Sequence, residues 1–243
     1  TAVDSELQVN ENDTQIHIKG REFAYTIDRR TALFTEMKFA GREYLNHPME
    51  LNIWRAPTDN DMYIRAEWEK AHYDEAYTRA YSEQILQNKF GVMIMCHAGV
   101  VAPTVQKLID VEIMWKIDGA GRIAAGITAV KDEELPDLPR FGIRMFLDKK
   151  LSEAAYYGMG PQESYRDKHR AASHGLFRSS VQELHEDYIM PQENGSHYDC
   201  DYVELTNQRY GMAVAAEHTF SFNASYYTQE VLTQTKHNYE LTE

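Results

Sequence analysis

The chain has 243 residues, of which 43% are apolar and 26% charged, so it can bury a sizeable core and is neither disordered nor fibrous in composition. Its 25 basic and 38 acidic residues leave a net charge of −13, which argues against nucleic acid as a partner, because such proteins neutralise phosphates with lysine and arginine. The longest apolar runs, such as 92–96, are far shorter than the roughly 18–20 residues that cross a bilayer, so no membrane association is predicted.

The two cysteines, Cys96 and Cys200, are too few for a disulfide framework and are predicted to be free thiols. Free thiols are typical of a reducing compartment, and no charged-then-apolar leader opens the sequence, so a cytoplasmic location is expected. A thiol nucleophile is not indicated, because Cys200 follows His197 by three residues and would lie on the opposite face of a strand.

Alternating apolar and polar residues dominate the sequence and predict strands with one face on a core. In chain order, the apolar members are Ile16 and Ile18; Phe23, Tyr25 and Ile27; Val111, Ile113, Trp115 and Ile117; Ile123, Ala125, Ile127 and Ala129; Phe141, Ile143, Met145 and Leu147; and Phe220, Phe222 and Ala224. The Asp-Gly-Ala-Gly run at 118–121 predicts a tight hairpin turn. Without a linker or an internal repeat, these strands predict one β-sandwich domain over residues 1–243.

Helical patterning is confined to two short stretches, which are predicted to be additions to the β framework. Ile64, Trp68 and Ala71 recur at helical spacing within 62–72. The second stretch is 228–234, where the leading threonine can cap the first turn. The acidic segment 131–140 contains two prolines and is predicted to be a loop between strands.

The segment 55–61, Arg-Ala-Pro-Thr-Asp-Asn-Asp, is interpreted as a turn before the first helix. One of its polar side chains at 59–61 is expected to cap that helix by accepting free N–H groups of the first turn. Pro57 keeps the preceding residue extended, so that a strand carrying Trp54 runs directly into the turn. Arg55 is expected to pair with one of the carboxylates.

No metal site is predicted. The Asp-Asn-Asp run is not a calcium loop of the EF-hand type because, counting from Asp59, the positions that need glycine and glutamate hold Ile64 and Lys70. The ten histidines include no His-x-x-x-His pair of the kind that binds zinc on a helix.

Two carboxylates stand out for sugar chemistry, which needs a pair about 5–10 Å apart across the substrate. Glu163 and Glu193 each lie in a Gly/Pro-rich segment that is predicted to form a loop at the edge of the sheet. Each could instead fix its loop by accepting backbone N–H bonds, and the residues alone leave both readings open. The 16 tyrosines are equally ambiguous, since tyrosine both stacks on sugars and packs in strands.

Four segments in order resemble the successive signatures of one family. They are NIWRAPTDND at 52–61, YYGMGPQESYRD at 156–167, YIMPQENGSH at 188–197 and FSFNASYYTQEVLTQTKHNYEL at 220–241. They are similar to the C-terminal domain of family 2 β-galactosidases, which also occurs as the small chain of split enzymes. The resemblance implies an all-β fold, an antiparallel β-supersandwich of the galactose-mutarotase-like type with one or two short helices, in an enzyme that hydrolyses terminal non-reducing β-D-galactose residues.

The resemblance also implies a noncatalytic role. In the family, the catalytic glutamates and the Mg²⁺ and Na⁺ sites belong to a preceding (β/α)8 barrel, so this chain is assigned no catalytic residue, metal ligand or cofactor and is predicted to be inactive alone. Its expected partner is the barrel-containing remainder or large subunit, on which it would pack and help wall the galactoside pocket. The family domain continues beyond 237–241 into a Gly-Asp-Asp-Ser-Trp segment, so the chain is expected to be truncated, as a natural small chain or as a cut piece.

Residues matching the family motifs form two sets. The substrate-binding candidates are Glu163, Glu193, Asn194 and His197. The residues expected to shape the motif loops are Trp54, Arg55, Pro57, Asp59, Asn60, Asp61, Gly158, Gly160, Pro161, Tyr165, Pro191, Gln192 and Gly195. Ser164 and Arg166 depart from the Asn and Pro that are common in the family, which puts the details of that loop in question.

Two other functions remain open from the sequence. An aldose mutarotase, on the fold that the resemblance implies, would need His197 or His174 beside Glu163 or Glu193 on one concave face. A stand-alone carbohydrate-binding module would instead need exposed tyrosines that stack on sugar.

Overall fold

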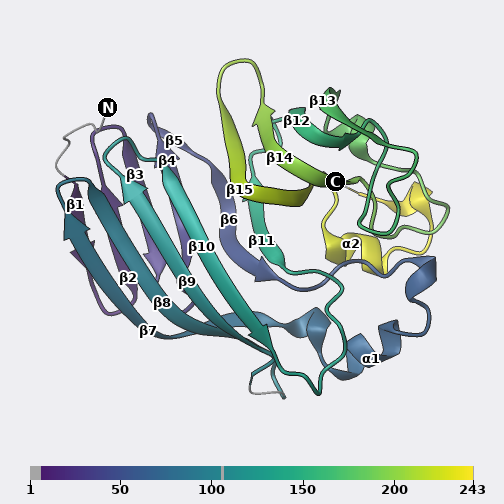
Figure 1. Ribbon diagram of the computed structural model, residues 1–243, viewed down its shortest axis with the longest axis horizontal. Helices are drawn as coiled ribbons and strands as arrows, with labels where there is room; N and C mark the ends of the chain where they lie inside the picture. The colour runs from purple at the N-terminus through teal and green to yellow at the C-terminus, as the bar shows by residue number, and fades with distance from the viewer. Residues whose placement is uncertain (1–6, 105–106, 243) are drawn as a thin grey trace. The chain divides into compact units, whose positions relative to one another are not determined.

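In the computed structural model, residues 7–104 and 107–242 are described (Figure 1). The backbone is mostly antiparallel β-structure, which confirms the predicted all-β fold. Contacts group the chain into two compact units: the first runs through Trp54 and resumes over Tyr63–Asp148, and the second comprises Arg55–Met62 and the chain from Lys149 onward. The single domain expected over residues 1–243 stays a prediction, since its test is whether the two units unfold together in one cooperative transition.

The first unit is a sandwich of two antiparallel sheets with an additional strand pair. One sheet contains, in chain order, β1 (Gln8–Glu11), β2 (Gln15–Lys19), β3 (Phe23–Asp28), β4 (Leu33–Phe39) and β5 (Arg42–Glu43). The other has the order β10-β9-β8-β7, made of β7 (Tyr77–Asn88), β8 (Gly91–Val101), β9 (Ile109–Asp118) and β10 (Ile123–Lys131). The strand pair is β6 (Leu45–Asn52) with β11 (Gly142–Leu147).

The two sheets meet through apolar faces that the alternation predicted. Trp115 on β9 is 2% exposed, and its ring meets Phe34 of β4 edge-on with the ring centroids 4.8 Å apart. The indole N–H donates to the Ala32 carbonyl at 2.8 Å, so the one polar atom of this ring is satisfied. In the hairpin turn between β9 and β10, Gly121 has a φ of +82°, which favours glycine. The predicted hairpin is confirmed.

Two predicted core faces are less covered than the alternation suggested. On β10, Ile123 and Ile127 are half-buried, but Ala125 and Ala129 are exposed. The predicted core face is therefore only partly covered, because β10 is an edge strand that, among the described residues, pairs only with β9.

The same correction applies to the strand predicted to begin at Phe141. Phe141 precedes β11 and is 38% exposed, and Ile143 within β11 is 39% exposed. Within the described chain β11 pairs only with β6, so these side chains belong to a two-stranded pair and not to one of the larger sheets.

Two short helices are present, as predicted: α1 (Arg65–Lys70) and α2 (Gln229–Gln234). In α1, the buried Trp68 ring meets Trp54 edge-on at 6.2 Å. The Thr228 hydroxyl accepts a hydrogen bond from the Val231 N–H at 3.3 Å, which confirms the predicted cap of α2. The loop predicted at 131–140 is confirmed between β10 and β11. Within 7–104 and 107–242, the helices are too short to span a bilayer.

The second unit is built on a four-stranded antiparallel sheet of order β13-β12-β14-β15. Its strands are β12 (Glu153–Gly160), β13 (Ser173–Ser180), β14 (Ser196–Thr206) and β15 (Gly211–Asn223). Short 3-10 turns occur at η1 (Asp59–Asp61), η3 (Gln182–Leu184) and η4 (Asn238–Glu240) here and at η2 (Tyr73–Glu75) in the first unit.

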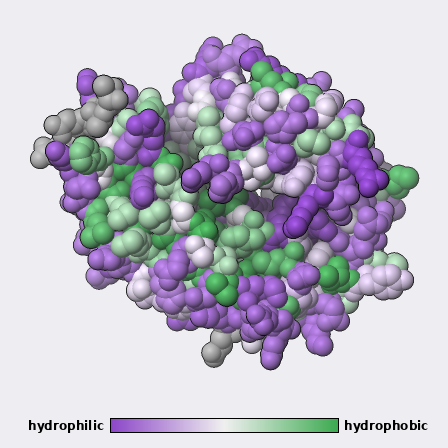
Figure 2. Space-filling model, viewed as in Figure 1, coloured by the Kyte–Doolittle hydropathy of each residue, from purple (hydrophilic) through white to green (hydrophobic). Residues whose placement is uncertain are grey.

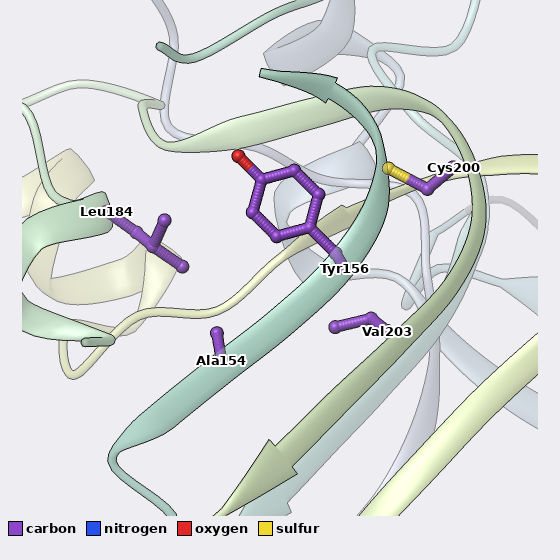
Figure 3. Close-up of a cluster of buried hydrophobic side chains, with 5 residues drawn as sticks. All are labelled: Ala154, Tyr156, Leu184, Cys200 and Val203. Carbon is purple, nitrogen blue, oxygen red and sulfur yellow. The ribbon is translucent and has the colours of Figure 1, made fainter. Parts of the chain in front are cut away.

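The apolar core of the second unit lies on one face of this sheet (Figure 3). Its buried members are Ala154, Tyr156, Leu184, Cys200 and Val203. Phe220, Phe222 and Ala224, predicted as one strand face, pack against this cluster. Both cysteines are buried and free, as expected, and burial raises the pKa of Cys200 to about 12, so its thiol is inert at neutral pH.

Candidate functional site

Glu163 lies in the loop after β12 and is held by donors from two loops. Its side chain is 6% exposed. Lys168 Nζ donates to Oε1 at 2.6 Å, and the Tyr188 hydroxyl donates to the same oxygen. The Tyr165 hydroxyl and the Gly195 N–H donate to Oε2 at 3.1 and 3.0 Å. The Glu163 cluster, defined as these five residues, therefore joins the loop after β12 to the loop before β14.

The charge state of Glu163 follows from these contacts. Burial alone raises the pKa of a carboxyl group, but here hydrogen bonds from Lys168, Tyr188 and the Gly195 N–H, together with the Lys168 charge, outweigh burial and lower the pKa of Glu163. The hydrogen bond between Lys168 and Glu163 also raises the pKa of Lys168. Glu163 is thus an ion at neutral pH with both oxygens occupied, whereas a general acid needs a raised pKa and a free proton.

Gly195 has a specific role in the Glu163 cluster. Its φ is +70°, and a Cβ added there would lie 2.4 Å from the Leu184 carbonyl oxygen. Only glycine therefore lets this backbone N–H point at the Glu163 carboxylate.

The segment 191–197, which holds three of the four substrate-binding candidates, is buried throughout. Glu193 is 4% exposed, its N–H donates to the Ala56 carbonyl at 3.1 Å, and its Oε1 accepts from Asn223 Nδ2 at 3.4 Å. Asn194 is 6% exposed, and its Oδ1 accepts from the Glu186 N–H at 3.1 Å. These side chains brace the loop from inside.

His197 packs against two aromatic rings that also contact each other. It is 1% exposed, with ring centroids 4.3 Å from Tyr156 and 5.2 Å from Phe222. Its Nδ1–H donates to the Met159 carbonyl at 3.2 Å, and among the described residues its Nε2 has no hydrogen-bond partner. Burial lowers the pKa of His197, so the imidazole is neutral at neutral pH.

The turn at 55–61 is arranged around Asp61. Arg55 Nη2 donates to Asp61 Oδ1 at 2.6 Å, which confirms the predicted pairing of Arg55 with a carboxylate. Asp61 Oδ2 accepts from the Thr58 N–H at 2.8 Å and from its hydroxyl at 3.0 Å. The predicted capping of α1 is wrong, because Asp61 closes the η1 turn instead and the N-cap of α1 is Ile64, which makes no side-chain cap.

The remaining motif residues support the same loops. Gln192 is buried, and its Oε1 accepts from the Asp59 N–H at 3.3 Å, which ties the 55–61 turn to the loop before β14. An added Cβ at Gly158 would lie 2.3 Å from Cys200 Sγ, so β12 and β14 approach closely there. Of the others, Trp54, Pro57, Gly160 and Pro191 are buried, and Asn60 and Pro161 are exposed.

The sequence did not point to three residues that hold these loops. Lys168 and Tyr188 complete the Glu163 cluster, and Ser164, noted only as a departure from the family pattern, is fully buried. Its hydroxyl donates to the Met159 carbonyl at 3.0 Å and accepts from the Tyr198 N–H at 2.9 Å. No local pattern marks these residues: Lys168 bonds within its own irregular loop, and Tyr188 and Tyr198 reach Glu163 and Ser164 from other segments.

The predicted site residues do not line a cavity found in the first unit. That cavity, of about 430 Å³ and wide open, belongs to the first unit and is lined by Asp13, Arg29, Arg30, Arg79, Ala80 and Glu83. In it Arg29 pairs with Glu83, and Arg30 pairs with Asp28 at 2.7 Å. Across residues 7–104 and 107–242, no group of three or more His, Cys, Asp or Glu side chains is placed to hold a metal ion.

The fold and the site together define a class: an antiparallel β-sandwich protein whose conspicuous carboxylates are held inside its loops and whose candidate histidine is buried in strand β14. The chain belongs to the β-galactosidase small chain family, whose family model matches residues 19–243. The resemblance inferred from the four sequence motifs is thereby confirmed.

Curated relatives are β-galactosidases that are much longer than this chain. The protein from Actinobacillus pleuropneumoniae is 41% identical over 239 residues, which cover 98% of this chain and 23% of the relative. That from Staphylococcus xylosus is 31% identical over 235 residues, 96% of this chain and 24% of the relative. That from Streptococcus thermophilus is 30% identical over 251 residues, 100% of this chain and 24% of the relative. The chain thus spans about a quarter of their length.

Proposed function

We propose that this chain is a noncatalytic domain of a β-galactosidase that packs on the catalytic barrel and helps wall the substrate pocket. The whole enzyme would hydrolyse terminal non-reducing β-D-galactose residues. The observation that supports the noncatalytic role most directly is the Glu163 cluster. Its ionised carboxylate accepts from four donors on its two oxygens, so it is suited to hold loops and has no proton to donate as a general acid.

The other candidate side chains support the same role. Glu193, Asn194 and His197 are each at most 6% exposed, so a sugar that touched them would have to displace the loop that they brace. Their predicted substrate contact stays a prediction, and the geometry favours positioning: they would shape the loop before β14, whose outer surface would border the pocket.

The partner would be the barrel-containing remainder or large subunit, with the galactoside bound mainly there. The Mg²⁺ and Na⁺ ions of the family are proposed to belong to that part, and no described residue of this chain is assigned to them. The galactose-mutarotase-like type of the sandwich and a cytoplasmic location are part of the same proposal.

Complementation tests the proposal directly. The chain alone, and the chain mixed with the 41%-identical relative lacking its matched region, would be assayed with a chromogenic β-galactoside. We expect no hydrolysis by the chain alone and a gain on mixing. A purified chain that hydrolysed the substrate by itself would refute the noncatalytic role.

A matched pair of variants sharpens this assay. Glu163→Gln removes the charge of the Glu163 cluster, and Glu153→Gln makes the same change at an exposed position on β12. If the loops shape the pocket, Glu163→Gln raises KM or lowers kcat in the complemented enzyme, while Glu153→Gln leaves both unchanged.

The mutarotase alternative has less support. His174, on β13, lies 3.0 Å from the Asp199 carbonyl oxygen and 3.6 Å from the Asp201 carboxylate, and neither Glu163 nor Glu193 is among its described contacts. Polarimetry of α-D-galactose with the chain would reveal accelerated mutarotation if this assignment were correct.

A further inference from the structure

Strand β10 forms an open edge of the β10-β9-β8-β7 sheet in the first unit (Figure 1). All nine of its residues pair with β9, from Ile123 opposite Ile117 to Lys131 opposite Ile109, without a bulge. Within the described chain its other side has no strand partner. The outward backbone N–H and C=O groups of such an edge are a template for pairing with another strand.

Edge strands are normally protected from pairing by charges, prolines, bulges or short length. The opposite edge of the same sheet, β7, carries Arg79 and Glu83 and is interrupted by a bulge. The edge strand β1 has only four residues. From Ile123 to Val130, β10 has neither a charged residue nor a proline. Among these edges, β10 is the one without protection.

Both faces of β10 also have exposed positions, although Ile123 and Ile127 are half-buried. Ala125 and Ala129 lie opposite Trp115 and Val111, which are buried in the core, yet both alanines are exposed. On the other face Val130 is 65% exposed. Figure 2 shows green and pale residues, which are apolar or weakly polar, over this part of the molecule. The alternating side chains that the sequence predicts to face the core therefore continue onto β10, where the sandwich leaves Ala125 and Ala129 exposed.

We propose that the free edge of β10 receives an extended strand from the part of a β-galactosidase polypeptide that this chain does not span. This inference rests on the proposed function. The added strand would carry small or apolar side chains beside Ala125 and Ala129, and its backbone would continue the ladder of the sheet.

The relatives supply the argument for this occupant. They carry the matched region within polypeptides of which it makes up only 23–24%, so most of their length lies outside this region and is the source proposed for the added strand. A second copy of this chain is the less suitable occupant, because it would bring together two chains with a net charge of −13 each.

Backbone hydrogen exchange in two contexts tests the proposal. One sample is the isolated chain, and the other is the 41%-identical relative with its matched region replaced by this chain. We expect the amides of 123–131 to exchange at least about tenfold more slowly in the chimera, since the outward groups gain partners. The interior strand β8 serves as the control and should change little. Equal exchange of β10 in both samples would overturn the proposal.

A charge placed on the edge provides a second test. Ala129→Asp in the chimera should abolish the protection of 123–131, and the control Gln84→Asp, at an exposed position on β7, should preserve it. Because both positions are exposed, we expect the melting temperature of the isolated chain to be unchanged by either substitution. Protection that survives Ala129→Asp would overturn the proposal, as would a dimer of the isolated chain that Ala129→Asp dissociates.

Hydrolysis of a chromogenic β-galactoside by the chimera separates this inference from the proposed function. An active chimera with an unprotected β10 overturns the strand addition and leaves the proposed function standing. An inactive chimera with a protected β10 supports the strand addition and counts against the proposed function.

Discussion

The core around Trp115 in the first unit and the Glu163 cluster in the second are both buried, but opposite kinds of chemistry stabilise them. Trp115 is surrounded by apolar side chains, and its indole N–H has one backbone acceptor. Glu163 is an ion whose burial is tolerated because four donors surround it. The first region depends on volume and the second on charge and hydrogen bonds.

This difference explains why the two regions suit different tasks. An apolar core is insensitive to pH and holds strands together over a large area. A buried carboxylate fixes the direction of each donor, so it can position loops that have no regular hydrogen-bond ladder of their own. The cost is that the loops depend on a single ionised group.

The largest expected effect is on the apolar side of the comparison. Trp115→Ala should lower the free energy of unfolding by about 3–5 kcal/mol, because it removes a large buried ring and leaves a cavity. Urea denaturation of the purified chain measures this, with Lys116→Ala on the exposed face of β9 as control, expected within about 0.5 kcal/mol of wild type. A loss below about 1 kcal/mol would mean that this core is not tightly packed.

Replacing Glu163 by Gln tests the polar side of the comparison. The amide keeps the shape but replaces charge-assisted hydrogen bonds by weaker ones and puts an N–H₂ group where donors converge. We expect a loss of about 2 kcal/mol, moderated because Lys168 is largely exposed and solvent screens its charge. Glu153→Gln should have no measurable effect in the same denaturation experiment.

The pH dependence of stability distinguishes charge from shape at Glu163. Because the folded state lowers the pKa of Glu163, its contribution is complete above the ordinary value of 4.5 and is lost as pH falls through the folded pKa. Wild type should therefore lose stability below about pH 4.5 more steeply than Glu163→Gln. Parallel pH profiles would show that the cluster acts through shape alone.

Arg55→Ala should destabilise the 55–61 turn by about 1–2 kcal/mol, since it leaves the buried Asp61 carboxylate without its cation. Arg65→Ala, which removes an exposed pair with Glu69, is the control and should cost less than about 0.5 kcal/mol. An unchanged melting temperature for Arg55→Ala would contradict the structural role of this turn.

The smallest effect is expected from His197 near neutral pH. Burial lowers its pKa below the ordinary 6.5, so the unfolded state gains a proton first as pH falls and stability declines below pH 6.5 until the folded pKa is reached. Between pH 7 and pH 6 the loss should stay below about 1 kcal/mol. His197→Gln should remove this slope, and His218→Gln on exposed β15 should retain it.

Much of the fold was predictable because strand patterning is local. The inward row on β9, the hairpin at 118–121 and the capping threonine of α2 each depend on residues within a few positions of one another, and all three were confirmed. The family motifs were also readable in order, and the family was confirmed.

The arrangement of the site was only partly predictable. The sequence placed Glu163 and Glu193 in loops and left open whether they act on sugar or brace the chain. It did not identify Lys168 or Tyr188, and it assigned the acceptors at 59–61 to the wrong helix. Tyr188 and Gly195 reach Glu163 from another loop, and Asp61 accepts from Thr58, three residues before it, and not from the first turn of α1.

The sequence by itself therefore determined the strands, the hairpin, the short helices and the family, since a period of two and a turn are properties of neighbouring residues. Tertiary structure alone decided that Glu163 is ionised and enclosed, that Asp61 closes its own turn, and that Ala125 and Ala129 reach the surface. Burial, charge state and edge exposure depend on which elements pack together, and that information is absent from any local pattern.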